Sequence, residues 1–102
     1  MSKLKTIGLT LRQLRENKKL LLREVGAVLS IDPTILSKIE RDERLPTREQ
    51  VIALGNFYSD NKDELIIAWL SDKLVCEIKD EELAFQALRL AEKKLRLLYV
   101  KN

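Results

Sequence analysis

Apolar residues recur at helical spacing near the start of the chain. Ile7, Leu11 and Leu14 are separated by three or four residues, with charged residues between them, which predicts a helix over about residues 6–18. A second apolar cluster begins at Leu22 and predicts another helix of about eight residues. These segments would be the first two helices of a helical domain.

A third helix is expected to begin at Asp32-Pro33. The aspartate side chain can accept hydrogen bonds from the free amides of a new helix, and proline suits the first helical position, where its missing N–H costs nothing. Ile35, Leu36 and Ile39 share one face, so this face should pack inward. On or near the opposite face lie Thr34, Ser37, Lys38 and Arg41.

Three more helices follow in the pattern. Residues 47–50 have the sequence of a capping box, which opens a fourth helix, and residues 59–61 can cap a fifth helix over about 62–78. The expected inward residues of the fifth helix are Leu65, Ile66, Trp69, Leu70 and Leu74. A sixth helix is expected over about residues 81–99.

The second and third helices are joined by a turn of about four residues, as a helix-turn-helix requires. We expect the core between them to contain Val25, Val28, Leu29, Ile31, Leu36 and Ile39. The third helix would be roughly 13 Å long, short enough to lie in a major groove about 12 Å wide. The pattern therefore predicts that the chain binds double-stranded DNA.

The sixth predicted helix has a wide apolar surface. One line of apolar residues follows alternating spacings of four and three, and a second line flanks it. The first line consists of Ala84, Leu88, Ala91, Leu95 and Leu98, and the second of Leu83, Ala87, Leu90 and Leu97. This width favours a homodimer, with an interface that contains Leu88, Ala91, Leu95 and Leu98. The alternative is that the helix closes the core of the monomer.

Composition supports a single all-α domain. The chain has 102 residues, the length of one ordinary domain, which we divide into a core at 6–58 and a helical extension at 59–102. Hydrophobic residues make up 45% of it and aromatic residues only 5%, with three glycines and two prolines. The core should therefore be aliphatic and the elements long and regular.

The inventory of reactive residues argues against an enzyme. The chain has no histidine and a single cysteine, Cys76, which removes His/Cys metal sites, a Ser/His/Asp triad and an intrachain disulfide. We expect no catalysis, no cofactor and no small-molecule ligand. Cys76 follows two apolar residues and should be a small buried hydrophobe. With neither a signal peptide nor a run of about 20 apolar residues, the protein is expected to be cytoplasmic and to have no membrane partner.

Charge adds a modest preference for an anionic partner. The net charge is +3, and the whole excess lies in residues 1–60, with 11 basic residues against 8 acidic ones. Arg23, Arg41 and Arg44 surround the third helix and would contact phosphates without regard to sequence. The alternative for each is a solvated surface residue.

Three segments resemble a known family: LREVG at 22–26, SKIERD at 37–42 and LPT at 45–47. They are similar to the λ-repressor-like, Cro-type regulators of the xenobiotic-response-element family, over about residues 7–58. The resemblance implies a λ-repressor-like bundle of about five helices, here with an added C-terminal helix. It also implies a dimer on a roughly palindromic operator, because one short helix reads too few base pairs to be selective.

The same resemblance assigns roles to individual residues. In that family, bases are read by the first two residues of the third helix and by polar positions one turn on. Here these positions hold Pro33, Thr34, Ser37 and Lys38, of which Lys38 is the best candidate for guanine O6/N7. Arg15 and Glu40 match a family ion pair between the first and third helices, and the alternative is two independent surface charges.

The chain departs from the family pattern at four positions. Leu22, Gly26, Ser30 and Asp42 stand where the family tends to have Gln, Ala, Gly and Gly. Leu22 has no polar group for the phosphate contact that glutamine would make. Pro33 also differs from the usual polar residue and cannot donate a hydrogen bond. Serine and aspartate are tolerated in turns, so the fold should be unaffected.

Together these patterns predict a sequence-specific, DNA-binding transcriptional regulator that acts as a homodimer. Small regulators of this pattern include phage repressors, controllers of restriction-modification systems and antitoxins. The main alternative is a protein-interaction module, such as an antitoxin whose C-terminal helices bind a partner protein. An enzyme is the least expected class, because the acidic residues are distributed as solvated helix faces and caps.

Overall fold

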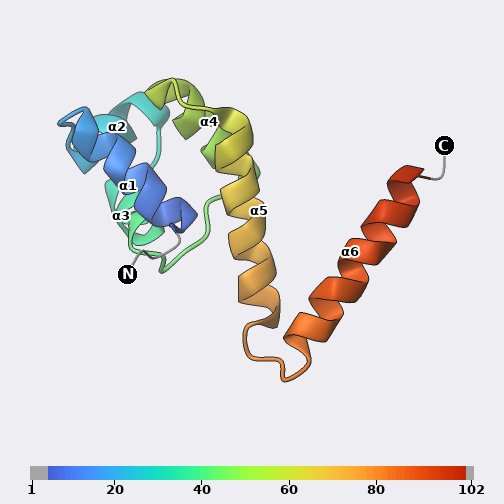
Figure 1. Ribbon diagram of the computed structural model, residues 1–102. Helices are drawn as coiled ribbons and strands as arrows, with labels where there is room; N and C mark the ends of the chain where they lie inside the picture. The colour runs from blue at the N-terminus through green and yellow to red at the C-terminus, as the bar shows by residue number, and fades with distance from the viewer. Residues whose placement is uncertain (1–4, 101–102) are drawn as a thin grey trace.

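The computed structural model describes residues 5–100, which form six helices joined by short loops (Figure 1). The helices are α1 (Ile7–Asn17), α2 (Leu22–Leu29), α3 (Pro33–Glu40), α4 (Arg48–Tyr58), α5 (Lys62–Ile78) and α6 (Ala84–Val100). No strand occurs within this range. The predicted all-α, λ-repressor-like bundle is therefore confirmed.

Side-chain caps set the first residue of four helices. The capping residues accept hydrogen bonds from backbone amides of the first turn, and they are Thr6, Asp32, Thr47 and Asn61. The helix starts expected at Asp32, at residues 47–50 and at residues 59–61 are confirmed, whereas Thr6, expected inside the first helix, is its cap. The sixth helix begins at Ala84 instead of Glu81, because residues 79–83 form turns in which the Ala84 amide donates to the Glu81 carbonyl at 3.2 Å.

The core is formed by α1 to α5. Its buried apolar residues are Ile7, Leu11, Val25, Leu36, Ile39, Val51, Leu54, Tyr58, Leu65 and Trp69. The Trp69 indole donates to the Pro46 carbonyl at 2.7 Å, which satisfies its only polar atom inside the core. The core role of Trp69 is confirmed, and the first half of α5 belongs to the bundle and not to an appendage.

Four expectations about burial are wrong. Val28 is 64% exposed, because Val25 and Leu29 are the residues of α2 that face the core. Leu70 and Leu74, expected inward on α5, are also exposed. The reason is that α5 is apolar on two sides, and only the side that carries Leu65 and Trp69 faces the bundle. Cys76 is exposed as well and is no buried hydrophobe.

Helix α6 stands away from the bundle (Figure 1). None of its residues is buried, so it does not close the monomer core, and that alternative is wrong. The radius of gyration is 15.8 Å, whereas a compact domain of about 100 residues has a value of about 13 Å. No helix among the described residues is long and apolar enough to cross a membrane.

The turn between α2 and α3 is tight. It consists of residues 30–32, and the Ile31 amide donates to the Gly26 carbonyl at 3.0 Å. A Cβ on Gly26 would collide with the Ile31 carbonyl oxygen, so this close approach requires glycine. Ser30 has a left-handed backbone, with φ of 57°, and Asp42 has φ of 62°. These are two of the positions where the resembling family tends to have glycine.

Because Ser30 has a left-handed conformation, we expect Ser30→Gly to raise the free energy of unfolding by about 0.5 to 1 kcal/mol. The matched control is Ala27→Gly, in the interior of the preceding helix, which should lower it by about 1 kcal/mol. Urea unfolding of the three proteins measures both changes. Destabilisation of similar size by both substitutions would contradict the strain at Ser30.

Candidate nucleic-acid interface

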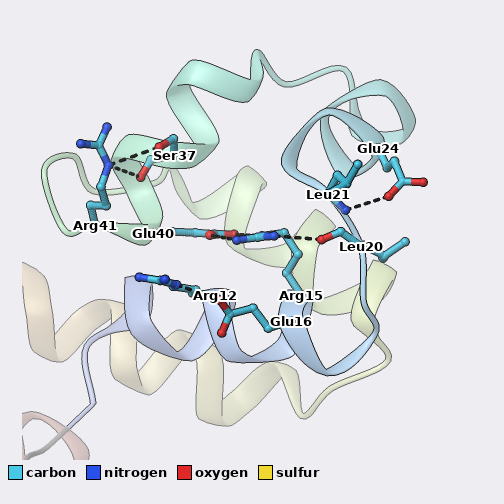
Figure 2. A network of polar contacts seen from close by, with 9 residues as sticks. All are labelled: Arg12, Arg15, Glu16, Leu20, Leu21, Glu24, Ser37, Glu40 and Arg41. Carbon is cyan, nitrogen blue, oxygen red and sulfur yellow. Dashed lines mark hydrogen bonds and ion pairs between the residues drawn. The ribbon is translucent and has the colours of Figure 1, made fainter.

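A bidentate ion pair joins α1 to α3. Arg15 Nε donates to Glu40 Oε2 at 2.8 Å and Arg15 Nη2 donates to Glu40 Oε1 at 2.9 Å. Arg15 Nη1 also donates to the Leu20 carbonyl at 2.8 Å, in the loop that precedes α2 (Figure 2). The guanidinium therefore fixes the end of α3 and the start of α2 relative to α1. The two residues are not independent surface charges.

Burial strengthens this pair. The side chains of Arg15 and Glu40 are only 14% and 7% exposed. The hydrogen bonds that Arg15 donates to the Glu40 carboxylate raise the pKa of the Arg15 guanidinium above its usual value, against the opposing effect of desolvation. Burial beside the Glu40 carboxylate also raises the pKa of Tyr58 to about 12. Arg15 and Tyr58 thus both keep their protons throughout the physiological range.

The start of α3 presents an exposed polar surface. Asp32 caps the helix by accepting from the Thr34 amide at 2.7 Å, and Pro33 occupies the first turn. Pro33, Thr34 and Lys38 are exposed, whereas Leu36, Ile39 and Glu40 on the other side of the helix are buried. Lys38 forms no ion pair with any residue in the range 5–100, so its charge is available to a ligand.

The end of α3 is arranged differently. Ser37 is half-buried, and Arg41 Nε donates to its hydroxyl at 3.2 Å and to its carbonyl at 3.3 Å (Figure 2). Arg41 Nη1 also pairs with Glu43 Oε2 at 2.9 Å. Ser37 and Arg41 are therefore hydrogen-bonded to each other, and the Glu43 carboxylate offsets the positive charge of Arg41.

The remaining predicted contacts do not all lie together. Arg23 is exposed on the first turn of α2. Arg44 lines a cavity of about 440 Å³ beside α5, together with Asp42, Asp72 and Lys79 among other residues. In this region the Ile7 amide donates to Asp72 at 2.7 Å, which anchors the start of α1 on α5. Arg44 is therefore an exposed arginine at the border of this cavity.

A smaller depression of about 200 Å³ lies between the first three helices. Its lining residues are Arg12, Arg15, Leu22, Ser37, Glu40 and Arg41. Arg12 was not among the expected site residues, although its place three residues before Arg15 could have indicated that both point toward α3. Leu22 contributes packing here and no polar group. The depression thus has two exposed arginines, Arg12 and Arg41, at its edge.

The sequence matches a family model described as a helix-turn-helix domain, over residues 6–64. The chain belongs to this family. Its matched region covers α1 to α4 and ends in the first turn of α5. The helix-turn-helix itself consists of α2, the turn at 30–32 and α3. Searches of curated proteins and of solved structures return no match.

The family assignment agrees with the chemistry of the described residues. Between residues 5 and 100 there is no cluster of His, Cys, Asp and Glu that could hold a metal ion. On α3 the exposed Thr34 hydroxyl and Lys38 ammonium are donors suited to phosphates and base edges, whereas the neighbouring carboxylates of Asp32, Glu40 and Glu43 are engaged within the protein. Helix-turn-helix domains place such a helix against DNA.

We expect Glu40→Ala to lower the free energy of unfolding by about 3 kcal/mol, because it leaves the largely buried Arg15 guanidinium without its partner. The matched control is Arg12→Ala, which breaks the exposed pair between Arg12 and Glu16 and should cost no more than about 0.5 kcal/mol. Thermal and urea unfolding give both values. Equal effects of the two substitutions would show that the buried pair has no special role.

Proposed function

We propose that this helix-turn-helix protein is a sequence-specific transcriptional regulator that binds duplex DNA with α3 in the major groove. The observation that carries the proposal is the exposed, unpaired polar surface at the start of α3, opposite a face that is locked into the core. The rigid inner face would hold the helix at a fixed angle, so that Thr34 and Lys38 reach base edges. The protein needs no cofactor for this activity.

Four residues of α3 take part in base recognition in this proposal, and their roles differ. Lys38 would donate to guanine O6 or N7, and Thr34 would contact an adjacent base. Pro33 would contribute apolar contact only, because it has no N–H. Ser37 would contact DNA together with Arg41, to which it is hydrogen-bonded.

The proposed phosphate contacts are Arg23, Arg41 and Arg44. A DNA phosphate would have to compete with the Glu43 carboxylate for the guanidinium of Arg41. Arg12 is added to this set because it borders the same depression as Arg41.

We further propose that two copies bind a palindromic operator. One helix of eight residues contacts only a few base pairs, whereas a two-fold dimer reads two half-sites about 34 Å apart. Helix α6 supports this step because its whole apolar surface lies outside the core. Leu88, Ala91, Leu95 and Leu98 are the proposed interface residues.

The same exposed helix also fits a second function, in which the chain is an antitoxin or adaptor and α6 binds a different protein. The two possibilities make different predictions for the purified chain. A homodimer would bind DNA unaided, whereas an adaptor would be monomeric and would need its partner. Sedimentation of the pure protein, followed by DNA binding with the same preparation, separates them.

The DNA-binding proposal predicts a selected sequence and a steep salt dependence. Selection from a random duplex pool should return two inverted half-sites. With about four to eight phosphates neutralised per dimer, the log–log slope of affinity against salt should lie between about −4 and −7. No enrichment and a slope near zero would show that the chain does not bind DNA as a regulator.

Substitutions separate base reading from phosphate binding. Lys38→Ala should lose about 1 to 3 kcal/mol at one base pair of each half-site and leave the preference at other positions unchanged. The control Arg23→Ala should weaken all sequences to a similar extent. Titration of the selected operator and of single-base variants measures both effects. A uniform loss with Lys38→Ala would remove this lysine from the base-reading set.

The dimer proposal predicts that Leu88→Asp combined with Leu95→Asp produces a monomer that retains the helices of residues 7–78. Each leucine would contribute about 1.5 to 3 kcal/mol of apolar burial in the dimer, less the cost of association. Gln86→Asp, on the polar side of α6, is the control and should remain dimeric. Sedimentation together with circular dichroism gives the result. A folded dimer with both leucines replaced would place the interface elsewhere.

A further inference from the structure

Helix α5 has a second apolar face that is left exposed by residues 5–100. Leu65 and Trp69 point into the core, whereas Ile67, Leu70 and Leu74 lie on the opposite side and are exposed. Ile78 continues this line and is half-buried. We call these four residues the outer stripe of α5. A regular apolar stripe of this length is unusual on a free helix surface, because it costs solvation free energy without stabilising the monomer.

The outer stripe matches α6 in spacing. Ala84, Leu88, Ala91 and Leu95 recur at intervals of four, three and four residues, and the outer stripe recurs at three, four and four. In an antiparallel pairing of α5 with α6, Leu74 can lie opposite Leu88 while Ile67 lies opposite Leu95. Apolar residues then meet along the whole stripe.

The charges of the two segments are also complementary. Helix α5 holds four acidic and two basic side chains, and the turn at 79–83 adds three acidic and one basic, whereas residues 84–100 hold four basic side chains and one acidic side chain. Opposite net charges favour docking of α6 on the outer face of α5 and disfavour pairing of two α6 helices alone. Complementary charge and matched spacing therefore point to the same pair of helices.

This contact is not made within one chain. Figure 1 shows α6 directed away from its own α5 beyond the turn. No residue of α6 is buried, and Leu74 remains 52% exposed. Among residues 5–100, the outer stripe of α5 and the apolar face of α6 are therefore both largely without a contact.

We propose that α6 of a second copy packs on the outer stripe of α5, and that the exchange is reciprocal, so that α5 and α6 of both chains form a four-helix interface. The inference rests on the proposed homodimer and specifies which surfaces form its interface. Of the 16 large hydrophobic residues exposed in the range 5–100, 13 lie at or beyond Ile67, in the segment that takes part in the exchange. The second apolar line of α6 then faces the other α6, which explains why this helix is apolar on more than one side.

Disulfide trapping tests the exchange without DNA. In a Cys76→Ser background, a chain with Leu74→Cys and Leu88→Cys is oxidised at micromolar concentration, and the linked peptides are identified by mass spectrometry. We expect a covalent dimer with 74–88 links between chains. A 1:1 mixture of the two single-cysteine variants should give the same 74–88 link. The control pair, Leu74→Cys with Arg89→Cys on the polar side of α6, should not form a link at a comparable rate.

Each other outcome overturns the proposal. A 74–88 link within one chain would show that α6 folds back on its own α5. Absence of a 74–88 link, in a protein whose circular dichroism is unchanged, would show that a foreign partner or another surface covers the stripe. Because DNA takes no part, a chain that gives the expected link but does not bind duplex DNA contradicts the proposed regulator and leaves the exchange intact.

Discussion

The ion pair between Arg15 and Glu40 is the contact on which the arrangement of the first three helices depends. A carboxylate that is 7% exposed carries a large desolvation penalty, and only two good hydrogen bonds to one guanidinium compensate for it. A third hydrogen bond, which Arg15 donates to the Leu20 carbonyl, attaches the loop before α2 to the same guanidinium. Two short helices that are held by apolar packing alone can slide along each other, whereas this planar ion pair fixes α1 and α3 in one register. The direction of α3 is thus determined by a polar contact on its buried side.

Much of this architecture could be predicted from the sequence because its signals are local. Asp32 and Pro33 fix the start of α3, and the capping box at residues 47–50 fixes the start of α4. Ser30 and Asp42 occupy left-handed positions that the family resemblance had marked by glycine. The pairing of Arg15 with Glu40 was likewise available from that resemblance, although no periodicity in the sequence indicates it.

The errors have a common physical origin. Helical periodicity shows that a face is apolar, but it does not show what covers that face. On α5 the apolar pattern predicts that Leu70 and Leu74 lie in the core, yet the bundle reaches only the side with Leu65 and Trp69. The contact between Ser37 and Arg41 was missed for a related reason, since both residues were considered only as contacts for an external ligand.

Because α6 contributes no buried residue, a regulator of the proposed kind would choose its partner and its target sequence through separate parts of the chain. Mutations that change α6 leave the packing behind α3 untouched, and mutations at Thr34 or Lys38 leave α6 untouched. After a gene duplication, two copies could therefore stop associating with each other before their binding sites diverge, or the reverse. The modular placement of one helix gives such a protein two independent routes of evolution.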